Sequence, residues 1–294
     1  MSASAVQQTG RSRLVGVDAA RLIAFLFVIL IHTAVPPGPR AAGVRLDGVI
    51  DQLARWAVPF FFITSGYFVG RSGPSASEAV FTLFKRIAPV FLFWSLLYIA
   101  VTPGGLARMT DLSFDILWLI RGGPGYHLWF LPSLFASVSL LHVVKGAPRA
   151  ALWAAAGLLY AIGLLLGSYK GVLGLTHFFW NMRDGPFFGF IFVVIGFELA
   201  RTSFRPTLAQ GAAICAAGAA LQLGEAIVLD GHFGKPFSSN DFLMGTLGYG
   251  LGAFLIAMRV GEGRIASNLS LLGRYALGYY VVHILFVLGF DVTP

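Results

Sequence analysis

Charged residues are scarce in this chain of 294 residues, of which only 12% are Asp, Glu, Lys or Arg. A soluble domain carries about 25% charged residues. Hydrophobic residues make up 57% of the chain, and a water-soluble protein of this size has too little interior to bury that much apolar surface. A disordered chain is excluded as well, because its composition would be polar. We therefore predict an integral membrane protein.

Cysteine is almost absent, since Cys215 is the single example, and this excludes an internal disulfide framework and a Cys-rich metal site. Its surroundings, AAICAAGAA, are typical of a close-packing helix surface. The sequence also lacks the H-E-x-x-H, P-loop and Rossmann motifs, so we predict no metal site and no nucleotide hydrolysis. The net charge of +8 does not indicate nucleic-acid binding, because the basic residues lie between apolar segments, as in cytoplasmic loops.

Apolar segments near the length of about 20 residues that crosses a bilayer predict an all-α, polytopic transmembrane helical bundle. The segment from Asp115 to Ile120 is expected to be a helix lying in the membrane interface. We divide the chain into a cytoplasmic tail over 1–13, a single transmembrane domain over 14–290 and a C-terminal stub over 291–294. Nine spans are expected, at 14–35, 49–70, 86–102, 127–144, 150–168, 186–200, 208–229, 241–258 and 275–290.

The orientation follows from the basic residues of the loops. More Lys and Arg fall in the loops on the side of the N terminus than on the opposite side. Cytoplasmic loops carry this excess, so we predict a cytoplasmic N terminus. The first span is not a cleavable signal sequence, because its apolar run is long and no A-x-A site follows.

In the first span, the ionisable residues Arg21 and His32 lie on either side of an apolar run of ten residues. Eleven helical steps of 100° return to within about 20° of the start, so both side chains share one face, roughly 16 Å apart along the axis. An ionisable residue inside a membrane costs several kcal/mol unless it is paired or hydrated, which makes it a functional candidate. The structural alternative is an Arg that extends to the interface and a His that caps the helix.

Several other segments combine aromatic and polar residues in a fixed order. These are FFITSGYF (61–68), the Lys85-Arg86 pair before Pro89, HLWFLP (127–132) and YYVVHILF (279–286). Together with the Arg21–His32 spacing, they resemble the acyltransferase 3 family, the multi-span acyl-CoA-dependent O-acyltransferases that decorate bacterial surface glycans. The resemblance covers about 14–290 and favours the stand-alone branch without an SGNH domain. The family usually has ten helices, and the last of them would begin after Asp291.

The resemblance implies a bundle around a polar tunnel in the bacterial inner membrane. Acyl-CoA, expected as acetyl-CoA, would dock from the cytoplasm as a co-substrate, with no tightly bound cofactor. The acyl group would pass to a hydroxyl of a glycan or glycolipid acceptor on the other side. His32 matches the catalytic histidine of the family and Arg21 its partner toward CoA. An imidazole can accept the proton of the hydroxyl or carry the acyl group itself, and both routes stay open.

Lys85 and Arg86 are the candidates for contact with the CoA phosphates. The family commonly has R-x-x-R before the proline of the third span, whereas here the first position is Leu83 and the second is Arg86. Lys85 supplies a charge one residue away from the expected position. Anchoring of a cytoplasmic loop by its positive charge explains the same residues without any ligand.

Further polar residues are candidate contacts of the tunnel or the acceptor: Ser65, His127, Trp129, Arg183 and Glu225. Their structural alternatives are a hydrogen bond from Ser65 to its own helix, interfacial anchoring by Trp129 and an ion pair between Arg183 and Asp184. Glu225 has no partner nearby in the sequence. Two more polar residues have structural explanations, since Glu198 is expected to pair with Arg201, and His283 to form hydrogen bonds between helices.

A second class of function also fits buried Arg, His and Glu residues on helices interrupted by Gly and Pro, namely a secondary transporter or flippase for a lipid-linked sugar. A transporter predicts substrate flux without thioester cleavage, and internal repeats that this sequence does not show. A succinyltransferase on the same scaffold would differ only in the charge of its pocket.

Overall fold

The computed structural model describes residues 14–33, 40–41, 44–71, 76–110, 116–175, 180–204 and 206–291. These residues are almost entirely helical, apart from an antiparallel pair of two-residue strands, β1 (Arg40–Ala41) and β2 (Val44–Arg45). Two short 3-10 helices are also present, η1 (Tyr126–Trp129) and η2 (Phe237–Ser239). The α-helices are α1 (Val15–His32), α2 (Leu46–Ala54), α3 (Ala57–Gly70), α4 (Ala76–Val101), α5 (Gly105–Thr110), α6 (Ile116–Ile120), α7 (Phe130–Val144), α8 (Arg149–Leu166), α9 (Pro186–Arg201), α10 (Leu208–Phe233), α11 (Gly245–Ala257), α12 (Arg264–Gly273) and α13 (Ala276–Asp291).

Each predicted span contains a helix, but the helices differ in length. Among the described residues, five helices are long and apolar enough to cross a membrane, and α12 with α13, which are bent by 68°, make a sixth if they count as one span. The all-helical membrane fold is therefore confirmed, whereas nine spans and the cytoplasmic N terminus stay predictions. The helix expected over 115–120 appears as α6, and its place in the membrane interface stays a prediction. Asp115, like the tail over 1–13, lies outside the described residues.

The predicted span 49–70 is interrupted at Arg55 and Trp56, between α2 and α3. Pro59 explains the break, because it lacks the N–H that would bond to the carbonyl of Arg55 in a continuous helix. The peptide N–H of Phe60 bonds to Trp56 at 3.1 Å and begins the new helix. The interruption leaves Arg55 at a bend rather than inside a regular helix.

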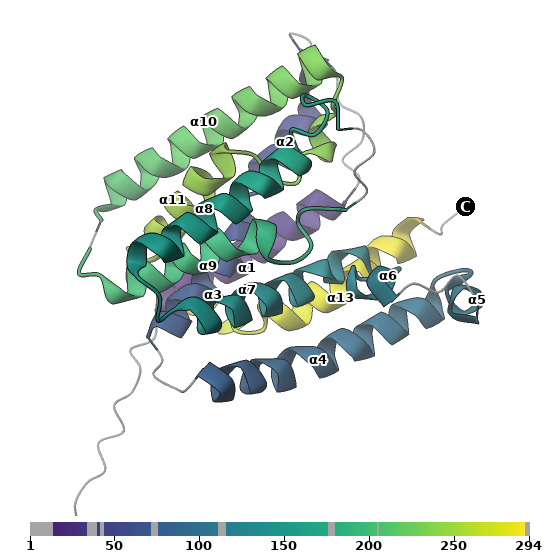
Figure 1. Cartoon of the computed structure of the whole chain (residues 1–294), viewed down its shortest axis with the longest axis horizontal. Coiled ribbons are helices and arrows are strands. Elements are labelled where there is room, and N and C mark those ends of the chain that lie inside the picture. Colours follow the sequence, from purple (N-terminus) through teal and green to yellow (C-terminus); the bar gives the residue numbers. More distant parts are fainter. Residues whose placement is uncertain are drawn as a thin grey trace, which may run out of the picture.

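The helix α9 is the centre of the bundle, and all of its residues from Phe188 to Glu198 are buried. It packs against α3, α7 and α8, while α4 lies at one edge and the pair α10 and α11 at the other (Figure 1). The outer side of α4 is apolar and exposed at residues such as Phe84, Phe93 and Leu96, as expected for a helix that faces lipid.

The contact between α3 and α9 depends on glycine. A Cβ at Gly196 would lie 1.9 Å from the carbonyl oxygen of Ile63, and one at Gly66 would lie 2.0 Å from that of Val193. Small residues of this kind let two helix backbones approach closely in a membrane. Gly252 plays the same part between α11 and Cys215 of α10, which agrees with the predicted close-packing surface around this cysteine.

Replacing Gly196 by leucine should therefore separate α3 from α9. We expect the free energy of unfolding to fall by at least about 3 kcal/mol, because the side chain would meet backbone that cannot move aside. Thermal unfolding of the detergent-solubilised protein measures this loss. Gly224→Ala is the matched control, since a Cβ at this helical glycine meets nothing within 4 Å. An equal change in both variants would contradict the packing argument.

Candidate functional site

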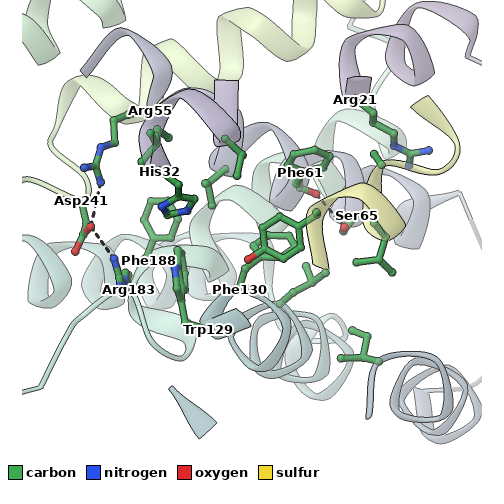
Figure 2. A pocket seen from close by; sticks show the side chains of 18 of the residues that line it. Arg21, His32, Arg55, Phe61, Ser65, Trp129, Phe130, Arg183, Phe188 and Asp241 are labelled. Atoms are coloured by element: carbon green, nitrogen blue, oxygen red, sulfur yellow. Dashed lines mark hydrogen bonds and ion pairs between the residues drawn. The ribbon is translucent and has the colours of Figure 1, made fainter. Parts of the chain in front are cut away.

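A cavity of about 530 Å³ runs through the bundle between α1, α3, α4, α7, α9 and α13 (Figure 2). Figure 2 shows Arg21 at one end, Arg55, Asp241 and Arg183 at the other, and His32 nearer to the second end. The polar residues that line the cavity are Arg21, His32, Arg55, Ser65, Arg86, Trp129, Arg183, Asp241, Arg274 and Tyr280.

Arg21 and His32 both line this cavity, as their spacing on one helix face predicts. Arg21 donates a hydrogen bond of 2.7 Å to Asp18, one turn earlier in α1, and its guanidinium lies 5.2 Å from the centre of the Phe68 ring. These contacts hold the guanidinium at its end of the cavity. They also balance part of its charge, which would be costly to bury alone.

His32 is the last residue of α1, and its ring is half-buried. The centre of the imidazole lies 5.2 Å from the ring of Tyr126 and 5.5 Å from that of His283. Its position at the helix end gives the ring aromatic neighbours on one side and the open cavity on the other.

Two further histidines lie behind His32. The ring centres of His127 and His283 are 4.9 Å apart, and that of His127 is 6.4 Å from His32. His127 is fully buried, and neither of its ring nitrogens has hydrogen-bond geometry to another described residue. Nδ1 of His283 lies 2.6 Å from the carbonyl oxygen of Tyr280, a bond inside α13 rather than the predicted bond between helices. No group of three potential metal ligands among the described residues has the geometry to hold an ion.

The two candidate donor-binding residues separate in the structure. Arg86 lines the cavity, whereas Lys85 is outside it, exposed, with its ammonium 4.2 Å from the centre of the Phe81 ring. Neighbouring residues on a helix point about 100° apart, so one of the two faces inward and the other faces away. Arg274, at the bend between α12 and α13, also lines the cavity.

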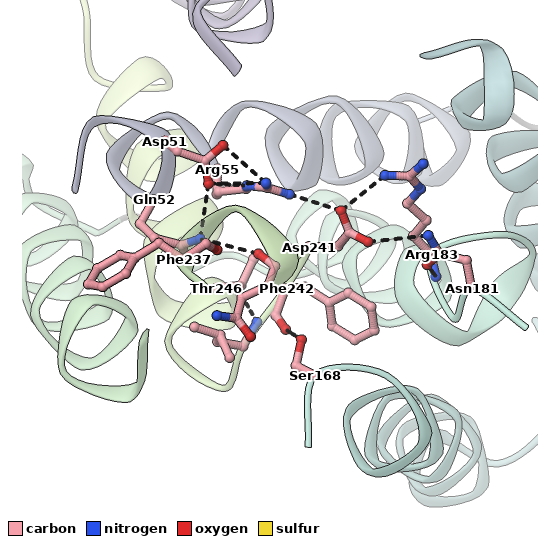
Figure 3. A network of polar contacts seen from close by, with 12 residues as sticks. Asp51, Gln52, Arg55, Ser168, Asn181, Arg183, Phe237, Asp241, Phe242 and Thr246 are labelled. Atoms are coloured by element: carbon pink, nitrogen blue, oxygen red, sulfur yellow. Dashed lines mark hydrogen bonds and ion pairs between the residues drawn. The ribbon is translucent and has the colours of Figure 1, made fainter. Parts of the chain in front are cut away.

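An ion-pair network lies at the opposite end of the cavity (Figure 3). Asp241 accepts hydrogen bonds of 3.0 Å from both Arg55 and Arg183, and Asp51 accepts from Arg55 at 3.0 Å. Asn181 donates to the second oxygen of Asp241 at 3.3 Å. Four charged groups of alternating sign are therefore held together next to the chamber that contains His32.

Arg183 also contacts an aromatic ring, since its guanidinium lies over Trp129, 5.1 Å from the ring centre. The predicted pair with Asp184 is present only as a long contact, with Nε and Oδ1 3.9 Å apart. The Nε atom is buried and makes no hydrogen bond to a described residue, so its N–H is available as a hydrogen-bond donor beside the cavity. Burial raises the pKa of Asp184 to about 6, and the charges of Arg183 and Arg121 only partly oppose this.

The remaining candidates have different surroundings. Ser65 lines the cavity and donates a hydrogen bond of 2.9 Å to Phe61 of its own helix, which is the structural alternative, while a contact with a ligand stays a prediction. Glu225 is not a lining residue of this cavity. Its carboxylate accepts the hydroxyl of Tyr169 and the peptide N–H of Gly245 at 2.9 Å, which caps the first turn of α11. Glu198 pairs with Arg201 at 3.9 Å, as predicted, and more closely with Arg149, at 2.5 Å.

The cap predicts a structural role for Glu225. Glu225→Ala should lower the free energy of unfolding by about 1–2 kcal/mol, the cost of a lost helix cap, and leave acyl transfer unchanged. Thermal unfolding and a transfer assay on one preparation test both parts. Loss of transfer with unchanged stability would instead assign Glu225 to the reaction.

Sequence reasoning did not select Arg55, Asp241 or Arg274 as site residues. Asp241 and Arg274 lie at the ends of apolar segments, where a charge is ordinarily explained by the membrane interface. Arg55 lies within the predicted span 49–70. The available signal was the position of Asp241, an acidic residue directly before an apolar run. Nothing in the sequence indicates that it meets Arg55, which is 186 positions away.

Comparison with known proteins identifies the family of this chain. The family model described as an acyltransferase domain, that of the acyltransferase 3 family, matches residues 14–292. Among curated proteins, the chain is 31% identical to an amino-acid racemase of Enterococcus faecalis over 62% of this chain and 27% of the relative. It is 30% identical to a serine/alanine racemase of Enterococcus gallinarum over 67% of this chain and 30% of the relative. The chain thus matches less than a third of the length of these relatives, and no solved structure matches it significantly. With the family model covering the whole bundle, the chain belongs to the acyltransferase 3 family, as its motifs predict.

Proposed function

We propose that this protein transfers an acyl group, acetyl in the first instance, from cytoplasmic acyl-CoA to a hydroxyl of a surface or exported glycan or glycolipid. The bacterial inner membrane is its proposed location. The observation that carries the proposal is that one cavity is lined by Arg21, Arg86, His32 and Arg183. Figure 2 shows Arg21 and Arg183 toward opposite ends of this cavity, with His32 nearer to Arg183, so that donor and acceptor would reach one imidazole from opposite sides.

The arginine-lined end suits the donor. Arg21 of α1, Arg86 of α4 and Arg274, at the bend between α12 and α13, all line the cavity. Arg274 follows Gly273, which packs against the backbone of Asp18 near Arg21. Guanidinium groups bind phosphate through paired hydrogen bonds and keep their charge at every physiological pH. Coenzyme A carries phosphate groups, so these arginines are the proposed contacts of its nucleotide portion. Lys85 is not included, because it is exposed outside the cavity.

At the other end, His32 is the proposed general base. Its imidazole accepts the proton of the acceptor hydroxyl while the hydroxyl oxygen attacks the thioester carbonyl. The tetrahedral intermediate then expels CoA as the carbon–sulfur bond breaks, and the proton returns from His32 to the thiolate. Arg183 is the proposed hydrogen-bond donor for the acceptor, since its Nε is buried without a partner among the described residues.

The second route places the acyl group on His32 before it reaches the acceptor. The two routes predict different intermediates. Labelled acetyl-CoA without acceptor would leave label on the protein only in the second route, and rapid acid quenching followed by peptide mass spectrometry would locate it.

Transfer itself is tested with purified protein in lipid nanodiscs, labelled acetyl-CoA and a glycan extract of a bacterial envelope. We expect label in the glycan fraction and matching release of CoA. The alternative of a transporter or flippase predicts movement of a lipid-linked sugar with no thioester cleavage. A preparation that is folded and binds acetyl-CoA, but never releases CoA with any glycan fraction, would contradict the proposal.

The racemase names of the relatives do not extend to this chain. They describe proteins more than three times as long as the matched segment, and the match covers 27–30% of them. The acyltransferase domain model, in contrast, covers residues 14–292. Acyl transfer is therefore the function that the matched region itself supports.

A further inference from the structure

His283 is a buried histidine that the reaction described above does not use. It belongs to α13, is 4% exposed and does not line the cavity, so it is not placed to contact either substrate. The centre of its ring nevertheless lies 5.5 Å from that of His32. Its Nε2 atom is buried and has no hydrogen-bond partner among the described residues. Such a group is rare in a native protein and calls for an explanation.

The other ring nitrogen fixes the tautomer of His283. Nδ1 lies 2.6 Å from the carbonyl oxygen of Tyr280, and a carbonyl oxygen can only accept a hydrogen bond, so Nδ1 carries the proton. No carboxylate among the described residues bonds to this ring, and a buried imidazole without a charged partner is neutral. Nε2 is therefore a bare nitrogen whose lone pair can accept a hydrogen bond.

Two other imidazoles lie near this acceptor, those of His32 and His127. The rings of His127 and His283 meet edge to face, with their planes 75° apart, so the edge of one ring points at the face of the other. The planes of His32 and His283 are only 31° apart. An N–H and a lone pair each lie in the plane of their own ring, so this smaller angle is the one that suits an N–H···N hydrogen bond.

His32 has room to turn its N–H toward His283. It is the last residue of α1, its ring is half-buried, and it lines the open cavity. Ring centres 5.5 Å apart bring nitrogens on the facing rims close to the length of about 3 Å of an N–H···N bond. A rotation of the His32 side chain, without movement of either helix, is enough to align the two groups.

We propose that His283 is a positioning residue whose Nε2 accepts the N–H of His32, so that the other nitrogen of His32 stays bare and faces the cavity. This inference rests on the proposed acyl transfer and adds a residue to it. The bare nitrogen takes the proton of the acceptor hydroxyl and returns it to the thiolate of CoA, while the proton between the two histidines stays on His32. In the route through an acylated His32, the same nitrogen attacks the thioester.

The tautomer of His32 is measured directly and without substrates. The full chain is labelled with ¹⁵N in its histidine rings, placed in lipid nanodiscs and studied by NMR at a pH where His32 is neutral. The signals of His32 are identified by their loss in His32→Ala. We expect one tautomer of His32 in the wild type and a mixture of both in folded His283→Leu, because leucine offers no acceptor. His283→Gln, whose amide oxygen is an acceptor, should keep one tautomer.

The transfer assay gives a second readout. His283→Leu should lower kcat by about 10–100-fold, as the loss of a residue that orients a reacting group does, and change KM for acetyl-CoA less than about twofold. His283→Gln should be at least about fivefold more active than His283→Leu, the gain of one neutral hydrogen bond. A merely structural role would not separate these two variants.

His142→Leu is the matched control. His142 is a buried histidine of α7 that does not line the cavity, and its Nδ1 lies 2.9 Å from the carbonyl oxygen of Val138 in its own helix. Its replacement removes the same kind of group from the interior. This variant should lose about as much thermal stability as His283→Leu and transfer acetyl at the wild-type rate.

A mixture of His32 tautomers in the wild type would overturn the inference, even where neither His283 variant folds. An unchanged tautomer in folded His283→Leu would overturn it as well, and would leave His127 as the partner of Nε2. Equal activity of the folded leucine and glutamine variants, or an equal loss in His142→Leu, would reduce His283 to a packing residue. A wild type with one His32 tautomer that transfers no acetyl group would refute the proposed function and not the contact between the two histidines.

Discussion

Replacing His32 by alanine should lower acetyl transfer by about 10²–10⁴-fold, the usual contribution of a positioned general base. The imidazole is the ionisable group that the cavity places between the arginine-lined end and the Arg183 end. After its removal, none of the α1 residues that line the cavity could take the proton of the acceptor hydroxyl. The measurement is the initial rate of label transfer from acetyl-CoA to glycan, with CoA release recorded in parallel.

The fold should survive this substitution, because His32 is the last residue of α1 and its ring is half-buried. His232→Ala is the matched control, since this histidine is exposed near the end of α10 and does not line the cavity. Both variants should unfold at the temperature of the wild type, and acetyl-CoA binding should persist in both. Transfer by folded His32→Ala at the wild-type rate would remove this residue from the mechanism.

Asp241→Ala should produce the second large effect, on stability as well as on transfer. The substitution removes the acceptor shared by Arg55 and Arg183, and Arg183 then loses the ion pair that holds it at 3.0 Å. Breaking a buried pair costs about 3–5 kcal/mol, and the quarter exposure of this side chain reduces the expected loss to about 2 kcal/mol. We also expect transfer to fall by about tenfold, because Arg183 is no longer fixed beside His32.

A double-mutant cycle separates this network effect from a general loss of packing. Arg183→Ala with Asp241→Ala should be less destabilising than the sum of the two single changes, because each single variant leaves the remaining partner with one opposite charge fewer. Asp230→Ala serves as the control for removing a half-buried aspartate that does not line the cavity of His32. Additive losses in the cycle would show that the pair is not coupled, and that Asp241 does not position Arg183.

The Lys85–Arg86 pair shows what a sequence pattern can predict about a site and what it cannot. The position of two basic residues before Pro89 is visible in the sequence, and so is their resemblance to a family motif. Which of them faces the cavity depends on the rotation of α4 against α7 and α13, and this places Arg86 inside and Lys85 over Phe81. The same limit applies to Glu225, whose partners at the start of α11 lie 19 and 20 positions away.

By itself, the sequence determined the membrane class, the positions of the helices and the common face of Arg21 and His32. Hydropathy and helical periodicity are local properties, and a helix in lipid satisfies its backbone hydrogen bonds within its own segment. Only the tertiary structure decided which helix ends lie together: it brings Arg55, Arg183 and Asp241 into contact and places two histidines beside His32. These contacts depend on the angles between helices and on how closely the helices approach each other. Glycine positions such as Gly196 permit the close approach, but no single segment encodes it.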